Sequence, residues 1–66
     1  MVKEIILIIL LFNGEAKLVS FPFEGTVMEC FAYGDQLRVK HATYSEERNA
    51  WFMNHGPGTW QGFICE

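Results

Sequence analysis

The chain opens with a run of residues that is apolar at every position. Residues 5–12 (Ile-Ile-Leu-Ile-Ile-Leu-Leu-Phe) lead directly into Asn13-Gly14. A helix that crosses a membrane needs about 20 apolar residues, whereas a strand needs about 5 to 8, so the length of this run favours a strand. Because alternate side chains of a strand point to opposite faces, the pattern predicts a strand over residues 3–12 with both faces buried.

Asn13-Gly14 separates this strand from a second strand-like segment, residues 16–22. Asn-Gly between two such segments is the strongest short signal for a β-hairpin, so we expect the two strands to pair antiparallel. Pro22 has no N–H to donate. We therefore expect the ladder to end there, with residues 23–25 carrying the chain away from the sheet.

Residues 26–29 (Thr-Val-Met-Glu) match a capping box, in which the Thr26 hydroxyl and the Glu29 carboxylate each accept a hydrogen bond from the other residue's backbone amide. This motif predicts a helix over residues 27–41. The residues expected on its inner face follow the i, i+3, i+4, i+7 spacing and are Val27, Cys30, Phe31, Gly34, Leu37 and His41.

The dipeptide Gly34-Asp35 leaves an alternative open. It could form a two-residue turn between two strands, which would make the whole chain all-β. We favour the helix because residues 28–32 would make a poor opposing strand. In a helix, Gly34 is expected where the helix backbone approaches the sheet closely.

The last third of the chain predicts a second hairpin. Residues 43–49 are mostly polar and are expected to form a surface loop, and the segments 49–54 and 59–65 then flank a turn that contains glycine and proline. The expected fold is therefore α+β, a four-stranded antiparallel sheet with one helix in the order ββαββ. We expect residues 1–66 to form a single domain.

One helix can cover only one face of such a sheet. The other face would leave five or six large side chains in water, which forgoes about 1.5 to 3 kcal/mol for each. We expect a second copy of the chain to cover this face in a homodimer, since an isologous contact requires only a self-complementary patch. A different protein or a lipid surface is the alternative. The residues expected at this interface are Ile6, Ile8, Leu10, Phe12, Trp51 and Trp60.

A chain of 66 residues is close to the smallest size at which a core supports itself. Cys30 and Cys65 are the only two cysteines. A disulfide between them would close a long loop and stabilise the fold by about 4 kcal/mol, whereas in a reducing compartment they would be buried thiols.

The net charge of −3, with five cationic side chains in the whole chain, argues against binding to nucleic acid or to an anionic membrane. Four residues have side chains suited to zinc, but their spacing matches no ligand motif. These four zinc-type residues are Cys30, His41, His55 and Cys65.

The sequence contains no catalytic or phosphate-binding motif. No orienting group accompanies a Cys-His pair or the carboxylates, and no lysine follows the glycines near residue 56 as a phosphate-binding loop requires. We expect no enzyme activity, no metal and no cofactor.

Residues 1–16 carry a weak signal for export. Lys3 precedes the apolar run and Gly14-Glu15-Ala16 offers small residues for cleavage, but Glu4 cancels the positive charge. The alternative function is therefore that of an exported or membrane-associated protein with a Cys30–Cys65 disulfide. A cytoplasmic location is favoured over a periplasmic or secreted one.

Several short motifs follow the apolar start of the chain and spread over most of its length. They are Asn13-Gly14-Glu15, the strand end Ser20–Phe23, Met28-Glu29-Cys30 and the closing Gly58-Thr59-Trp60-Gln61-Gly62-Phe63-Ile64-Cys65. Together these motifs resemble those of short proteins from marine phages and marine metagenomes. The resemblance implies a viral or marine microbial origin and assigns no catalytic residue. We expect a small interaction module that dimerises, with a host or phage protein as a further partner.

Overall fold

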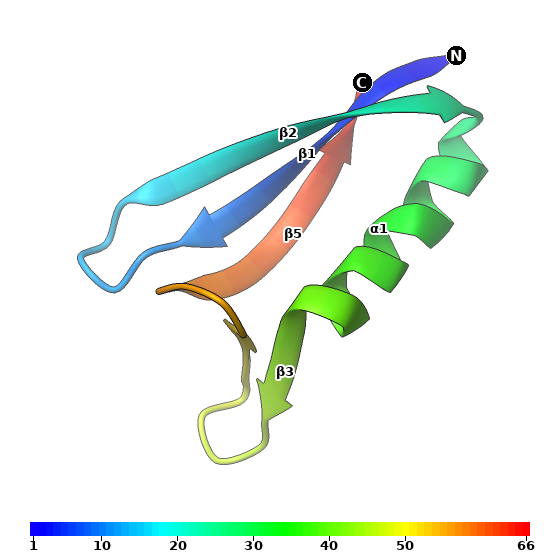
Figure 1. The fold of residues 1–66 in the computed structure, drawn as a ribbon. Helices are drawn as coiled ribbons and strands as arrows, with labels where there is room; N and C mark the ends of the chain where they lie inside the picture. Colours follow the sequence, from blue (N-terminus) through cyan, green and yellow to red (C-terminus); the bar gives the residue numbers. More distant parts are fainter.

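The computed structural model, which describes residues 1–66, contains one helix on one side of a single antiparallel sheet (Figure 1). The strands follow the order β2-β1-β5-β4-β3 across the sheet. The α+β class is confirmed, and the all-β alternative is wrong. The elements in chain order are β1 (Val2–Leu10), β2 (Ala16–Gly25), α1 (Val27–His41), β3 (Ala42–Ser45), β4 (Ala50–Met53) and β5 (Thr59–Cys65).

The helix begins at the predicted capping box. The Thr26 N–H donates to Glu29 Oε1 at 2.9 Å, and the Glu29 N–H donates to Thr26 Oγ1 at 3.1 Å. These bonds satisfy two amide groups that the first turn of a helix leaves free. The helix spans the 27–41 interval expected from the sequence.

The inner face of α1 is narrower than the periodicity indicates. Val27 and Phe31 are each 52% exposed, so neither is buried, although the Phe31 ring still contacts the edge of Phe63 in β5, with 6.1 Å between centroids. Tyr33 packs against the core in their place, with its ring stacked on Phe23 at 5.4 Å between centroids. The buried helix residues are Cys30, Gly34 and Leu37.

In the β1–β2 connection, residues 12–14 form a three-residue loop that Leu11 and Glu15 close. The Gly14 N–H donates to the Leu11 carbonyl at 3.0 Å, the Leu11 N–H donates to the Glu15 carbonyl at 2.8 Å, and Gly14 has φ 90°. This is the geometry of a type I turn followed by a glycine bulge. Phe12 therefore lies in the turn, and the expected strand over residues 3–12 instead ends at Leu10.

Pro22 does not end the second strand, as its lack of an N–H had suggested. β2 continues to Gly25, and Pro22 is paired with Glu4 of β1. Hydrogen-bonding direction alternates along an antiparallel strand, so the bond from Leu11 to Glu15 sets the even-numbered residues of β2 toward the free edge of the sheet. The backbone nitrogen of Pro22 therefore points to the free edge, where an N–H would have no partner strand, so the proline costs no ladder hydrogen bond.

The residues expected to form a polar loop after the helix include a fifth strand, so the prediction of four strands is wrong. β3 pairs with β4 from Ala42 opposite Met53 to Ser45 opposite Ala50. The turn between them places Asn49 at φ 54°, and the Tyr44 hydroxyl donates to Asn49 Oδ1. The connectivity is therefore ββαβββ.

A β-bulge in β5 decides which way its aromatic residues point. Ile8 is opposite Gly62 and Ile9 is opposite Trp60, so Gln61 is an extra residue on this strand. The bulge reverses the alternation beyond it. Trp60 consequently lies on the helix side of the sheet and is only 9% exposed.

The core lies between α1 and the sheet. Gly34 allows the helix to approach β5 closely, because a Cβ at this position would overlap the ring of Phe63. This is the close approach expected from the sequence. The buried hydrophobic cluster consists of Val2, Ile5, Leu7, Cys30, Leu37, Ala42 and Trp60.

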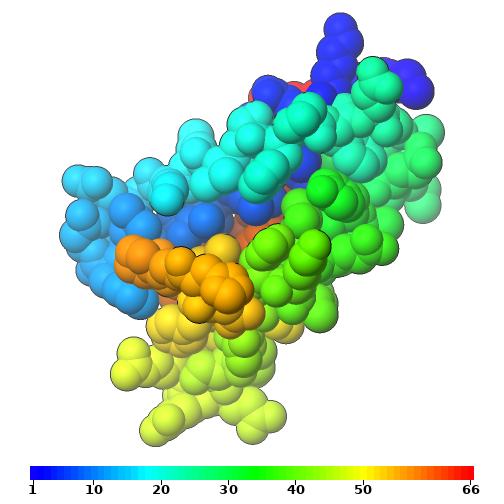
Figure 2. All heavy atoms as spheres, viewed as in Figure 1, coloured from blue at the N-terminus to red at the C-terminus, as the bar shows by residue number.

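The helix covers its side of the sheet incompletely. Only 11 of 66 residues are buried. In the space-filling view, atoms of β1 remain visible between β2 and the green helix (Figure 2). A small core such as this one gains from a covalent link, and the structure contains one: Cys30 of α1 and Cys65 of β5 form a disulfide with a Cα–Cα distance of 6.3 Å.

Candidate functional site: the open face of the sheet

The side of the sheet opposite α1 carries a continuous set of apolar side chains. The pairing register places Ile8 between Leu18 of β2 and Gly62 of β5, and Ile6 next to Ile64. Leu10 is opposite Thr59, which is in turn opposite Phe52 of β4. We call this surface the open face. Its large apolar side chains are those of Ile6, Ile8, Leu10, Leu18, Phe52 and Ile64, with Phe12 added from the β1–β2 turn.

These side chains are substantially exposed to solvent. Leu18 is 63% exposed and Phe12 is 69% exposed, while Leu10 and Ile64 are each exposed by two fifths or more. Ile6 and Ile8, in the middle of the set, are half-buried by their neighbours. Large contiguous apolar patches are uncommon on soluble monomers and mark surfaces of interaction.

One end of the open face is aromatic and carries a cation. The rings of Phe12 and Phe52 lie 6.3 Å apart between centroids, and the guanidinium carbon of Arg48 lies 5.6 Å from the centroid of Phe52. The face of an aromatic ring attracts a cation, so this contact holds the Arg48 head group over the open face.

The opposite end of the open face is acidic. Glu4 and Glu66 are directly opposite each other, since each donates its backbone N–H to the other's carbonyl, at 2.9 and 3.0 Å. Ser20 Oγ donates to Glu4 Oε2 at 2.8 Å. Two carboxylates on neighbouring strands repel each other, and neither has a cationic partner within the chain.

Four of the six residues expected at an interface belong to the open face: Ile6, Ile8, Leu10 and Phe12. The two tryptophans lie on the other side of the sheet. Trp60 is in the core because of the bulge at Gln61, and Trp51 is half-buried beneath the Arg38 guanidinium, 4.9 Å from the ring centroid.

Three further residues of the open face were missed from the sequence. Ile64 lies opposite Ile6, so it could have been assigned to the open face from the alternation along the last strand. Leu18 lies opposite Ile8, and it can be assigned only once the register between β1 and β2 is known. Phe52 is recognised only through the pairing of β4 with Thr59.

The other candidate residues do not assemble into a site. The disulfide occupies both cysteines, and no group of three or more His, Cys, Asp or Glu side chains is placed to hold a metal ion. The structure therefore does not bring together the four zinc-type residues.

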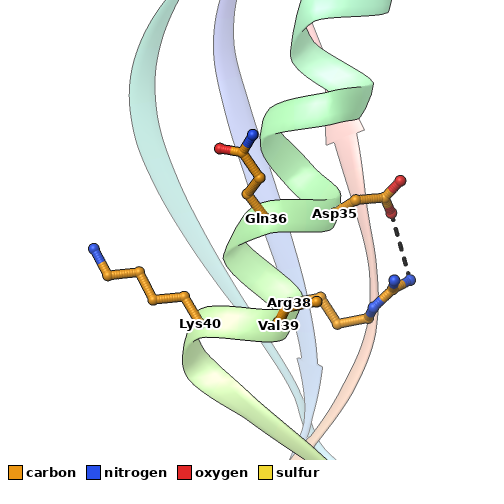
Figure 3. Close-up of a pocket in the computed structure, with 5 residues that line it drawn as sticks. All are labelled: Asp35, Gln36, Arg38, Val39 and Lys40. Atoms are coloured by element: carbon orange, nitrogen blue, oxygen red, sulfur yellow. Dashed lines mark ion pairs between the residues drawn. The ribbon is translucent and has the colours of Figure 1, made fainter.

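A shallow hollow of about 380 Å³ lies on the outer surface of α1. All of its lining residues come from one stretch of the helix, and in Figure 3 Gln36 and Lys40 extend to one side while Asp35 and Arg38 extend to the other. Asp35 and Arg38 form an ion pair at 3.4 Å. A hollow bounded by a single helix cannot surround a ligand, so the open face is the stronger candidate.

The helix of this protein lacks the length and apolar character that crossing a membrane requires. Comparison of the chain with protein-family models, with curated proteins and with solved structures finds no match.

Proposed function

We propose that this protein is a small, non-enzymatic interaction module that forms a homodimer through the open face of its sheet. The observation that carries the proposal is the continuous apolar surface on the side of the sheet opposite α1. A second copy brings the same surface, so two open faces can bury each other around a two-fold axis.

The solvent-accessible surface of the chain is larger than expected for a compact monomer, which supports the proposal that a second copy covers the open face. It measures 4755 Å², whereas a compact monomer of 7.6 kDa is expected to expose about 4300 Å². The excess agrees with a sheet that is covered by protein on one face only.

The size of the open face suits a dimer. The molecule extends 37 and 22 Å along its two longer axes, so a face that spans both covers on the order of 800 Å². Each partner of a standard protein–protein interface contributes about this area. Two such sheets would pack about 10 Å apart, with their apolar side chains interdigitated.

The test compares two substitutions of equal exposure on opposite sides of the molecule. Leu18 on the open face is 63% exposed and Val39 on α1 is 64% exposed. We expect sedimentation equilibrium to find a dimer for the wild type and for Val39→Lys, and a monomer for Leu18→Lys. Circular dichroism should show that all three proteins are folded.

The homodimer proposal is wrong if the wild type is a monomer at every concentration, or if the two substitutions weaken association equally. Binding of the wild type to neutral lipid vesicles in place of self-association would assign the open face to a lipid surface.

The disulfide favours a second candidate, a protein exported to an oxidising compartment, because disulfides are rare in the cytosol. Residues 1–16 include β1, which lies between β2 and β5, so we expect the exported protein to retain them. Fractionation of the native host followed by intact mass measurement should find the full chain outside the cytoplasm with no free thiol. A cytoplasmic protein with two thiols that react with an alkylating reagent would contradict export.

A further inference from the structure

We propose that the two copies pack with their strands antiparallel across the interface, so that Arg48 of each copy lies over the acidic end of the other. This inference rests on the homodimer proposed above and specifies its geometry. It follows from the positions of the charges on the open face.

The cationic and acidic groups lie at opposite ends of the open face. Glu4 and Leu10 are six residues apart in β1, which corresponds to about 20 Å along an extended strand, and Phe12 lies in the turn beyond Leu10. Arg48 lies over Phe52, and the Phe52 ring lies next to that of Phe12. Glu66 is directly opposite Glu4 at the other end.

These charges have no partners within one copy. The only ion pair in the structure joins Asp35 and Arg38 on α1, so neither Glu46 nor Glu47, which precede Arg48 in its turn, lies within ion-pair distance of it. The guanidinium is held only by the ring of Phe52.

The charged side chains at the strand ends on this side of the molecule keep the acidic end negative. Lys3 adjoins Glu4 in β1, and Glu24 lies at the end of β2, which pairs with the start of β1. One positive and three negative side chains, those of Lys3, Glu4, Glu24 and Glu66, give this end a net charge of −2.

In an aligned packing of two sheet faces, the two-fold axis runs either along the strands or across them. An axis along the strands stacks like ends, so that Arg48 faces Arg48 and the carboxylates face each other, which is unfavourable. An axis across the strands near Ile8, midway between Glu4 and Phe12, brings each Arg48 toward Glu66 and Glu4 of the second copy. Unlike charges then meet at both ends of the interface, while the apolar residues between them remain in contact.

The test reverses the charges separately and together. In a buffer of low ionic strength, Arg48→Glu alone, and Glu4→Lys with Glu66→Lys, should each raise the dissociation constant of the dimer on the order of tenfold, because each change affects both symmetry-related contacts. The three substitutions combined should return it to within about threefold of the wild-type value, since unlike charges meet again. Added salt should weaken the wild-type dimer.

Lys40→Glu provides the control, because it alters the net charge by as much as Arg48→Glu but lies on the exposed side of α1. It should leave the dissociation constant unchanged. If the wild type dimerises but the single reversals have no effect, or the combined variant fails to recover, the antiparallel geometry is wrong and the homodimer stands. A wild type that does not dimerise would overturn both proposals.

Discussion

At the level of single residues, Gly34 determines how closely α1 approaches the sheet. A methyl group at this position would overlap the Phe63 ring, which itself packs against the core. Glycine is otherwise a poor helix residue, about 1 kcal/mol less favourable than alanine. Its presence in the middle of α1 is explained by packing.

We expect Gly34→Ala to destabilise the protein by about 1 to 3 kcal/mol, because overpacking outweighs the gain in helix propensity. Urea denaturation measures the difference. Gly56→Ala is the control, since a Cβ at Gly56 meets no atom within 4 Å. In a protein that carries Phe63→Leu, adding Gly34→Ala should cost less stability than it costs in the wild type, because the smaller side chain leaves room for the methyl group. A stabilising Gly34→Ala would show that the helix can shift away from the ring.

The protonation of Glu29 makes the stability that the capping box contributes depend on pH. The backbone and hydroxyl of Thr26 hydrogen-bond to Glu29 and lower the pKa of its carboxyl group below the ordinary value of 4.5. A carboxyl group with a lowered pKa in the folded state contributes stability above the unfolded-state pKa and loses it as pH falls through the folded-state pKa.

The free energy of unfolding of the wild type should therefore exceed that of Glu29→Gln at neutral pH, and this advantage should shrink as pH falls below 4.5 and through the lowered folded-state pKa of Glu29. Denaturant titrations across this range measure the difference. Glu47, exposed in a turn without a side-chain hydrogen bond, supplies the control variant Glu47→Gln. An equal pH dependence in both variants would assign the effect to net charge and not to the capping box.

At the level of elements, the disulfide fastens α1 to β5, two elements joined otherwise only by side-chain packing. The linked cysteines are 35 positions apart. Closing a loop of this length removes freedom from the unfolded chain and stabilises the fold by about 4 kcal/mol in the chain-entropy model.

Replacing both Cys30 and Cys65 with alanine should lower the free energy of unfolding by about this amount. A thiol reductant should lower the stability of the wild type similarly and leave the double variant unaffected, as measured by guanidinium denaturation with and without reductant. If reductant has no effect on the wild type while mass spectrometry confirms that the bond is broken, packing alone holds α1 to β5.

The elements that could be predicted from the sequence are those specified by local chemistry. The capping box at Thr26 and the glycine turn at Asn13-Gly14 act within a few residues, so the helix and first hairpin were recognised. β3 was missed because Thr43 and Tyr44 are both exposed, which leaves no alternation to detect.

The pairing register of the strands cannot be predicted from a local sequence pattern. Whether the missing N–H of Pro22 faces a neighbouring strand or the free edge depends on pairing with β1, and the side on which Trp60 lies depends on the bulge at Gln61. For the same reason, alternation assigns the open-face side chains of β1 from Glu4 to Leu10, whereas both tryptophans lie on the opposite side of the sheet.

At the level of the whole molecule, the free energy of folding should include the contact between two copies. A monomer with so few buried residues has a small core, and burial of the open face would add apolar contacts that form only on association. Stability that comes from association depends on protein concentration, whereas stability from the core and the intramolecular disulfide does not.

The thermal midpoint of the wild type should therefore rise with protein concentration. Two chains that unfold and dissociate together should have an unfolding enthalpy of roughly 90 kcal/mol, which corresponds to about 5 °C for each tenfold increase in concentration. Leu18→Lys should melt lower and at a constant temperature, while Val39→Lys should keep the concentration dependence. Differential scanning calorimetry over a hundredfold range of concentration measures this slope. A wild-type midpoint that stays constant would show that the open face contributes nothing to stability through self-association, because only a coupled equilibrium between chains can make the midpoint depend on how many chains are present.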